Sequence, residues 1–544
     1  MERTSAPATP DYLTIANLLS QYYMRRASIA LLLGLVACKI ASPLSPGPGA
    51  TGSYRYEVDL RYLDQQRLRV RVTVPSVQAG PAVFVIPKVV PGIYGVQNFG
   101  QYVRDVVAFD RQNRPLTVVR QDTNTWTIAE TRRLHHLTYS VAPTWAEFRT
   151  GKGQRPVFYR SAGSSYHPDS AFVLNYNTFV GYLEGQPARS YQVRFTKPLG
   201  LYGASYLTPE ALNDTIDRVR APTYRELVDA PVLYARPDTA WLRLGKTRVL
   251  VALYAGVHQP PYAPAVARSL RTMLEAQQAY LGGTLPVEKY AFLLYHRTQG
   301  AADRSVSDGL EHSHSTLCLL ESPGVGDLNE FVRGIAAHEF FHTVTPLHMH
   351  SEEIEHYDFR HPAFSEHLWL YEGLTEYETI HMPIREKLET LPEFIKVLEA
   401  KAQAMSKFND TLALTRLSRQ VATRQDQFFN FYLKGALFNL CLDIRLRELS
   451  GGRLGTQELT QHLLHRYGPH QPFRDTQLFD VLTQLTYPSM RAFFRDYLED
   501  GRSLPLRETL AKVGLEYDPA THTIRLTAHP TPAQLALRQA WIGQ

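Results

Sequence analysis

The sequence predicts a multidomain α+β protein, with an amino-terminal antiparallel β domain, a mixed α/β domain in the middle and a helical domain toward the carboxyl end. Three observations support this fold class. A chain of 544 residues is too long for one ordinary core. In the first third, apolar residues alternate with polar ones, as at Leu68, Val70 and Val72, which is the period of a half-buried strand. Beyond Asp327 the apolar residues recur at the helical period.

The composition is that of a globular chain, with 44% apolar and 20% charged residues. The formal net charge of +6 is small for this length, and no run of lysine or arginine concentrates it, so we expect no nucleic-acid partner. Beyond residue 53 the cysteines are Cys318 and Cys441, both inside apolar segments. We expect buried free thiols at both positions rather than a disulfide or metal ligands. Nothing in the sequence indicates an oligomeric state.

The first 53 residues contain the features of an export signal. Two arginines follow Met24, then an apolar run of about a dozen residues, and Leu35-Val36-Ala37-Cys38 closes that run. The run is too short to span a bilayer as a helix but suits a secretory signal. Its end resembles the lipobox of bacterial lipoproteins, so we expect translation to start at Met24, cleavage before Cys38 and a lipid on the Cys38 thiol. A plain signal peptide with a chance cysteine is the alternative.

This resemblance predicts an exported bacterial lipoprotein that is anchored to a membrane and faces the periplasm or the cell surface. Residues 39–53 are rich in proline, glycine and serine and are expected to form a linker.

Changes in pattern divide the rest of the chain. Strand-like segments with turn signals give way to a mixture that includes a helix at Ala265–Leu281, ended by two glycines, and a buried strand at Glu288–Tyr295. The expected units are a β domain at 54–196, a mixed domain at 197–384, a helical domain at 385–510 and a carboxyl-terminal extension at 511–544.

The helix with the strongest chemical signal begins near Asp327. Asp327 and Glu330 have the spacing of a capping box, and the helix is expected to continue to Thr345, where Pro346 stops it.

Two histidines on this helix form a candidate metal site. Phe331, Ile335, His338 and His342 make one stripe, so both imidazoles point the same way and can reach one cation. Glu339 lies beside them, free to accept a proton. This His-Glu-x-x-His pattern is typical of zinc hydrolases, while a buried, hydrogen-bonded histidine pair is the alternative.

Two residues compete as the third ligand. His348 lies six residues after His342, which is the metzincin spacing, but Thr345 stands where that motif needs glycine. Glu372 lies in the apolar segment LWLYEGL, on a helix that Ser365 can cap. A buried carboxylate requires a partner, and a cation already held by two histidines supplies one. With Glu372, the site has three protein ligands and an open fourth position, as catalytic zinc requires.

The connection between these helices, residues 348–367, is rich in histidine and carboxylates. We expect most of it to be a solvated loop, with a second metal as the alternative. Its members besides His348 are His350, Glu352, Glu353, Glu355, His356, Asp358, His361 and His367.

Segments spread over most of the chain resemble one known family. They are VFVIPKVVPGIYGVQNFGQYV, DGLEHSHST, HEFFH, LWLYEGLTEY, FYLKGALFNLCLDIRLRE and YLEDGRSLPLRETLAKVGLEY, with 29 residues between His342 and Glu372. Together they resemble the glycyl aminopeptidase family of gluzincin zinc metallopeptidases, metallopeptidase family 61, which is related to aminopeptidase N. The resemblance implies a thermolysin-like catalytic domain at 197–384, between the β domain and the helical domain.

The resemblance also implies roles for the metal motif. His338, His342 and Glu372 would bind one zinc ion per chain, and Glu339 would accept a proton from the water that zinc activates.

Further roles follow from the same family. Tyr432 would donate a hydrogen bond to the oxyanion, although a packed core tyrosine is the alternative. Glu311 would bind the free α-amine of the substrate, and Gly309 and Leu310 would lie along its backbone, although Glu311 alone could be an edge-strand charge. Apart from the family, Glu376 lies one helical turn after Glu372 and is placed to orient a zinc-bound histidine, with a solvated surface glutamate as the alternative.

Some features depart from the family pattern. Asp308 replaces a glycine before GLEH, and TVTPLHMHS stands where many members have Trp-Asn and a basic run, which puts a preference for glycine in question. About 30 residues follow GLEY, so we expect no PDZ domain after the catalytic part.

We therefore expect a zinc aminopeptidase that releases amino-terminal residues, such as glycine, alanine or other small ones, from peptides with a free amino terminus. A zinc endopeptidase and a catalytically silent surface lipoprotein that binds peptides or glycans are the alternatives.

Overall fold

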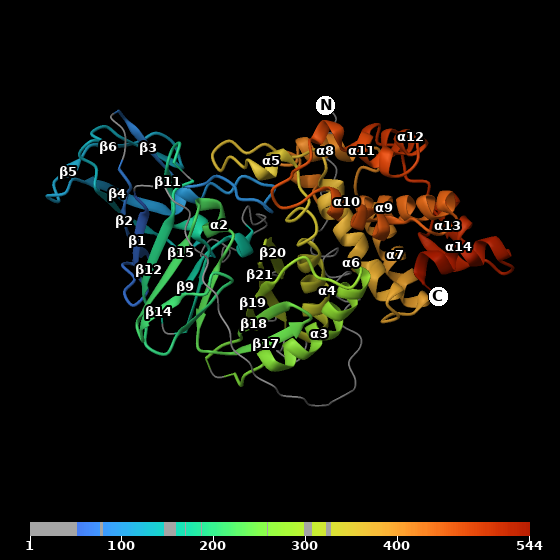
Figure 1. Cartoon of the computed structure of the whole chain (residues 1–544), viewed down its shortest axis with the longest axis horizontal. Helices are drawn as coiled ribbons and strands as arrows, with labels where there is room; N and C mark the ends of the chain where they lie inside the picture. Colours follow the sequence, from blue (N-terminus) through green and yellow to red (C-terminus); the bar gives the residue numbers. More distant parts are fainter. Residues whose placement is uncertain are drawn as a thin grey trace, which may run out of the picture.

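The computed structural model describes residues 52–543 except 77–79, 146–158, 169, 187, 258, 299–306 and 323–327. Figure 1 shows three regions side by side, with β strands on the left, a sheet with helices in the lower centre and helices on the right. The expected lipidation site Cys38 and most of the linker lie outside the described residues.

The amino-terminal region is built from strands that alternate buried and exposed residues. In β1 (Tyr54–Asp59) and β2 (Leu68–Thr73) every second side chain is buried, as the sequence predicts. The large sheet has the order β14 (Glu210–Asn213), β15 (Ile216–Ala221), β12 (Tyr191–Thr196), β1, β2, β8 (His136–Val141), β4 (Val103–Phe109), β5 (Pro115–Leu116). Its strands pair antiparallel except β1 with β12, which run parallel.

Two smaller antiparallel sheets complete this region. One has the order β13 (Tyr202–Ala204), β16 (Val232–Ala235), β10 (Ala171–Leu174), β9 (Ser165–His167). The other has the order β11 (Tyr182–Leu183), β3 (Ala82–Val85), β7 (Thr125–Ile128), β6 (Val118–Arg120). Short helices between the strands are η1 (Phe99–Tyr102), η3 (Arg160–Ala162), η4 (Tyr176–Thr178) and α2 (Tyr224–Val228).

The sheets extend the β region beyond the expected boundary. The sequence suggests that the catalytic domain begins at residue 197, but β13 to β16, between Tyr202 and Ala235, pair with one another and with earlier strands such as β10 and β12. Alternation identifies a strand without identifying its partner, which is why the sequence pattern cannot place this boundary.

The central sheet begins with β17 (Thr239–Leu244). Its order continues with β18 (Thr247–Tyr254), β19 (Lys289–Thr298), β21 (Ser315–Ser322) and β20 (Asp308–His312). The inner strands β18, β19 and β21 run parallel, and β20 pairs antiparallel at one edge. Helices α3 (Ala263–Tyr280) and α4 (Leu328–Phe341) cover one face of this sheet and share a hydrophobic core with it. Both α3 and β19 confirm elements that the sequence predicts.

The other face of the central sheet packs on the β region. Apolar side chains of β10, β13 and β16 form one core cluster with those of β18, β19 and β21. The central sheet is thus enclosed between helices on one side and a second sheet on the other.

The helical region surrounds α9 (Asn430–Ser450), which is buried almost all round. The other elements are α5 (Glu352–Glu355), η6 (Trp369–Leu374), α6 (Thr375–Arg385), α7 (Leu391–Met405), α8 (Leu414–Arg419), η7 (Gln425–Gln427), α10 (Thr456–Arg466), η8 (Asp475–Gln477), α11 (Leu478–Leu485), α12 (Met490–Phe494), η9 (Arg495–Glu499), α13 (Leu506–Lys512), β22 (Leu515–Asp518), β23 (Thr523–Leu526) and α14 (Pro532–Ile542).

The carboxyl-terminal extension docks onto this region. Trp541 of α14 is fully buried, and its indole N–H donates to the Tyr377 hydroxyl at 2.9 Å. Cys318 and Cys441 are buried free thiols, as expected. Among the helices of the described residues, none has both the length and the hydropathy needed to cross a bilayer.

Candidate active site

Helix α4 presents the two histidines of the motif. It ends at Phe341, four residues before the predicted end, because the N–H groups of Thr343 and Val344 bond carbonyls three residues back. The His342 N–H still donates to the His338 carbonyl at 3.3 Å, so the two imidazoles keep helical spacing. The predicted cap residue Asp327 lies outside the described residues.

Hydrogen bonds fix the proton position on both imidazoles. Nδ1 of His338 lies 2.8 Å from a Glu376 carboxylate oxygen, and Nδ1 of His342 lies 2.9 Å from the Thr345 carbonyl. Since these partners only accept, each Nδ1 donates a proton to them, and Nε2 is the nitrogen left to bind a metal. The two Nε2 atoms are 3.1 Å apart, so both face one small space.

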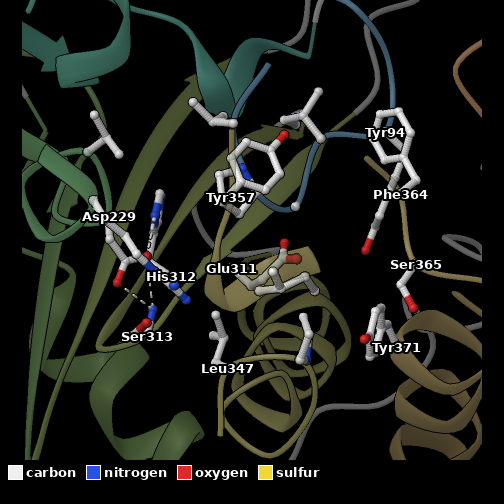
Figure 2. Close-up of a pocket in the computed structure, with 18 of the residues that line it drawn as sticks. Tyr94, Asp229, Glu311, His312, Ser313, Leu347, Tyr357, Phe364, Ser365 and Tyr371 are labelled. Atoms are coloured by element: carbon white, nitrogen blue, oxygen red, sulfur yellow. Dashed lines mark hydrogen bonds and ion pairs between the residues drawn. The ribbon is translucent and has the colours of Figure 1, made fainter. Parts of the chain in front are cut away.

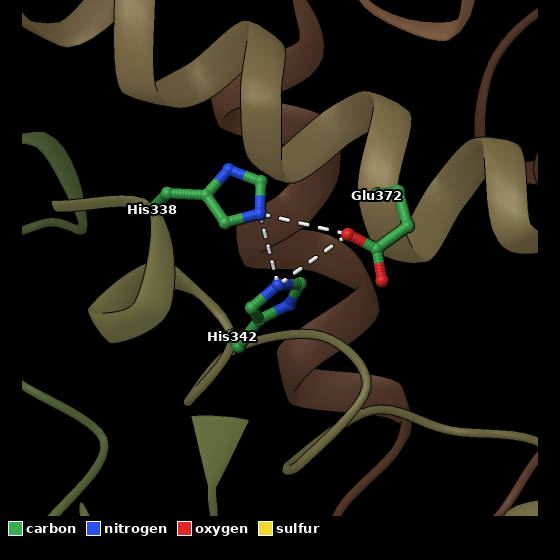
Figure 3. Close-up of side chains that lie close together, drawn as sticks. All are labelled: His338, His342 and Glu372. Atoms are coloured by element: carbon green, nitrogen blue, oxygen red, sulfur yellow. Dashed lines mark hydrogen bonds and ion pairs between the residues drawn. The ribbon is translucent and has the colours of Figure 1, made fainter. Parts of the chain in front are cut away.

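Glu372 comes to the same space from η6, a single π-helical turn that leads into α6. Ser365 does not cap this helix, which begins at Trp369, because its hydroxyl accepts from the His367 N–H and donates to Asp475. Glu372 is 1% exposed, and its Oε2 lies 3.5 Å from His338 Nε2 and 3.6 Å from His342 Nε2. Figure 3 shows the three side chains pointing toward one another.

These three atoms fit a zinc ion. Ligands about 2.1 Å from a tetrahedral ion lie about 3.4 Å from each other, close to the three distances between His338, His342 and Glu372. Oε2 of Glu372 is buried and accepts no hydrogen bond from the described residues, which is costly for a carboxylate without a cation. Two imidazoles and one carboxylate are a typical ligand set of catalytic zinc.

Tyr432 reaches the site through a close helix crossing. A Cβ built on Gly373 would lie 2.8 Å from the Gly435 Cα, so η6 and α9 touch backbone to backbone. One turn before Gly435, the Tyr432 ring lies 5.6 Å from the His338 ring. Burial and the Glu372 carboxylate raise the pKa of Tyr432 well above its ordinary range, so the phenol keeps its proton and can donate.

Glu339 extends from α4, and its carboxylate lies against the edge strand β20. It is buried, one of its carboxylate oxygens has no partner among the described residues, and burial raises its pKa to about 7. A Cβ built on Gly309 of β20 would lie 2.5 Å from the other carboxylate oxygen. Glycine at position 309 therefore lets the Glu339 carboxylate lie against the strand.

Glu311 extends from the same edge strand. Glu311 is 8% exposed. Three atoms, namely a carboxylate oxygen of Glu311, a carboxylate oxygen of Glu339 and a ring nitrogen of His342, lie within 4.8 Å of one another. Burial and the carboxylates of Glu372 and Glu339 raise the pKa of Glu311 well above its usual value. The side chain of Leu310 points away and packs in the core of the β region.

A mostly apolar pocket opens beside Glu311. Figure 2 shows Glu311 in its centre, Asp229 and His312 on one wall, and Tyr94 and Phe364 on the other.

Glu376 is not a solvated surface residue. It joins His338 to the buried ammonium of Lys401 on α7, with which it forms an ion pair. Burial alone raises the pKa of Glu376, but Lys401 and His338 outweigh this and lower it to about 2.

Sequence reasoning misses two residues of the site. The Tyr94 hydroxyl donates to Glu372 Oε1 at 2.7 Å from the β region, and Lys401 pairs with Glu376. The sequence does indicate that Lys401 is unusual, since it lies on the otherwise apolar face of α7. Nothing in the sequence indicates the role of Tyr94 beyond its place in the Pro-Gly-Ile-Tyr segment.

The histidines of the connection 348–367 form no second ligand cluster among the described residues. Among the described residues, His348 joins no group with metal-ligand spacing, nor does any other member of residues 348–367. Several bond protein groups instead, such as His350 with Glu355 and His367 with the Asp475 carbonyl, both at 2.9 Å.

Comparisons with known proteins agree with this arrangement. The peptidase M61 N-terminal domain matches residues 55–236, and the M61 glycyl aminopeptidase domain matches residues 331–438, together just over half of the chain. A comparison with curated proteins gave no match.

Two solved structures show the same fold. An aminopeptidase N family protein from Idiomarina loihiensis has 21% identity and a TM-score of 0.72, over 85% of this chain and 78% of that one. An M1 zinc metallopeptidase from Deinococcus radiodurans has 15% identity and a TM-score of 0.51, over 83% of this chain and 94% of that one. These likenesses confirm the expected fold class of β domain, catalytic domain and helical domain.

Proposed function

The chain belongs to peptidase family M61 and is a zinc metallopeptidase, and we propose that it is an aminopeptidase that releases the first residue of peptides with a free amino terminus. The observation that supports this most directly is the buried Glu311 carboxylate beside His342 and Glu339.

One zinc ion per chain would be held by His338, His342 and Glu372. When bound, it supplies a Lewis acid that polarises the scissile carbonyl and lowers the pKa of water to about 7.

Glu339 is the proposed general base. Its buried carboxylate lies beside the metal ligands and has a pKa of about 7, so it is partly ionised at neutral pH and matched to a proton from water. It would pass that proton on to the leaving amine after the peptide bond breaks.

Tyr432 is the proposed oxyanion donor. Its hydroxyl remains protonated near neutral pH, and its ring lies beside His338, on the side of the site formed by α9. A buried donor placed before the reaction stabilises the negative charge that develops on the carbonyl oxygen.

Glu311 is the proposed anchor for the α-amine. An oxygen of its carboxylate is buried without a partner among the described residues, and a substrate ammonium would satisfy it. The strand β20 would align the substrate through the backbone of Gly309 and Leu310. An amine held at a fixed distance from the metal selects the first peptide bond.

We further propose a preference for small first residues such as glycine and alanine. The turn at Pro91-Gly92 lies against the anchor, since a Cβ on Gly92 would lie 2.8 Å from both Glu311 oxygens. This turn limits the space next to the amine. Amino-acid p-nitroanilides of glycine, alanine and leucine test the preference, which is wrong if leucine has the highest kcat/KM.

We also propose that the protein is exported and anchored through a lipid on Cys38, on the strength of the lipobox-like Leu35-Val36-Ala37-Cys38. Mass spectrometry of the mature protein from membranes tests this, and an unmodified amino terminus at any other residue contradicts it.

A paired-substrate experiment tests the activity. We expect a short peptide with a free amine to be cleaved at its first bond, and its N-acetylated form to have at least about 100-fold lower kcat/KM, because the acetylated peptide leaves Glu311 buried and unpaired. The Glu311→Gln variant should lose this discrimination, and Glu339→Gln should lose turnover while it keeps zinc.

Equal turnover of the two peptides would identify an endopeptidase. A zinc-loaded wild type that cleaves neither would favour a binding protein.

A further inference from the structure

The β region contributes one side chain to the metal site. Tyr94 lies between β3 and η1, is 7% exposed, and donates its hydroxyl to Glu372 Oε1 at 2.7 Å. The two residues are 278 positions apart in the chain. The bond therefore crosses from the β region to the helix that supplies a proposed zinc ligand.

Several contacts hold Tyr94 in place. The Gln425 side-chain amide donates to the Tyr94 carbonyl at 2.9 Å, and the ring of Tyr94 packs 5.8 Å from Phe428 and 6.4 Å from Phe364. Two residues earlier, Gly92 has φ +81° and lies against the Glu311 carboxylate. One short turn thus contacts both Glu311 and Glu372, and contacts with neighbouring side chains hold this turn in place.

The two oxygens of Glu372 have different surroundings. Oε1 accepts a hydrogen bond from the Tyr94 hydroxyl, whereas Oε2 has no hydrogen bond within the described residues and lies 3.5 and 3.6 Å from the two imidazole nitrogens. The Tyr94 hydroxyl is the donor in this bond, because a carboxylate oxygen can only accept.

We propose that Tyr94 is a positioning residue that commits Glu372 to bind zinc through Oε2 alone. A carboxylate can bind a metal through one oxygen or through both. An oxygen already engaged with a phenol is a poor second ligand, so the remaining coordination position stays open for water and substrate. The β region is then part of the catalytic apparatus, and this inference rests on the proposed zinc site.

Metal binding by the Tyr94→Phe variant tests the proposal. Zinc affinity is measured by competition with a chromophoric chelator, and the cobalt-loaded protein is examined by visible absorption, whose intensity falls when the coordination number rises above four. We expect zinc affinity to fall about 10- to 100-fold, as is usual when a partner of a metal ligand is removed, and the cobalt bands to lose intensity.

The matched control is Tyr139→Phe. Tyr139 is also buried in the β region, and its hydroxyl donates to the Phe179 carbonyl at 2.6 Å, far from the proposed zinc ligands in the hydrogen-bond network. Its zinc affinity and cobalt spectrum should equal those of the wild type. If Tyr94→Phe also equals the wild type in both measurements, Tyr94 is only a contact between domains and the proposal is overturned.

A measurement on the wild type keeps the proposal testable if the variant does not fold. X-ray absorption or a crystal structure of the zinc-loaded protein should show one Glu372 oxygen bound, and binding through Oε1 or through both oxygens overturns the proposal. Neither measurement depends on peptide cleavage. A failure of the proposed activity is therefore distinguishable from a failure of this inference.

Discussion

Replacing Gly309 by alanine tests whether Glu339 acts from its observed position. The new Cβ would lie 2.5 Å from a Glu339 carboxylate oxygen and 2.8 Å from its Cδ, whereas ordinary contacts begin at 3.4 Å. The carboxylate must therefore move by about 0.9 Å. The backbone of β20 tolerates alanine, because the φ angle of Gly309 is not in the left-handed region.

A displacement of this size has a calculable effect on the rate. Misplacing a catalytic group by about 1 Å costs about 100-fold in rate, or about 2.7 kcal/mol of transition-state stabilisation. The three atoms nearest to the new methyl group all belong to Glu339, which is not a proposed metal ligand. We therefore expect kcat to fall about 100-fold while zinc content stays unchanged.

The assay is steady-state hydrolysis of a glycyl or alanyl p-nitroanilide, with zinc content and melting temperature measured on the same sample. Gly468→Ala is the control, since its new Cβ would meet only a His348 nitrogen at 3.9 Å. If Gly309→Ala retains full kcat with zinc bound, Glu339 does not act as the base from this position. A loss of zinc in proportion to activity would likewise refute the reasoning.

Three further substitutions have expected outcomes. Tyr432→Phe should lower kcat about 100- to 1,000-fold at nearly constant KM, as loss of one oxyanion donor does; an unchanged kcat would assign Tyr432 to packing. Lys401→Met should destabilise the protein by about 3–5 kcal/mol in urea unfolding, because the Glu376 carboxylate is left buried without its cation, and adding Glu376→Gln should restore part of this loss. Glu378 is fully buried, and burial raises its pKa from 4.5 to about 8. Between these pH values the folded protein keeps a proton that the unfolded chain releases, so the free energy of unfolding falls as the pH rises from 4.5 to 8. The free energy of unfolding of Glu378→Gln should therefore exceed that of the wild type by up to about 5 kcal/mol at pH 8 and should equal it at pH 4. Melting curves at fixed zinc, which should show a higher melting temperature for the variant only at pH 8, are the measurement.

The sequence predicts best what depends on local spacing. His338 and His342 share a helix face because they are four residues apart, and Glu372 is identifiable because a carboxylate in an apolar segment requires a partner. The early end of α4 is a smaller error, since helix ends depend on tight turns that pattern alone does not show.

Contacts between distant segments are what the sequence could not show. The bond of Tyr94 to Glu372 requires that a turn of the β region reach the helices, and alternation within β15 does not reveal that this strand pairs with β12. The contact between Gly373 and Gly435 could not be predicted either, because a glycine indicates that something packs closely against the backbone but does not identify that segment.

The face-to-face packing of β10, β13 and β16 on the central sheet has a mechanical consequence. Separating these sheets would expose a continuous apolar layer to water, so we expect the two regions to unfold as one cooperative unit. The β region that contains Tyr94 is thus joined to the central sheet by an apolar layer rather than by a linker alone.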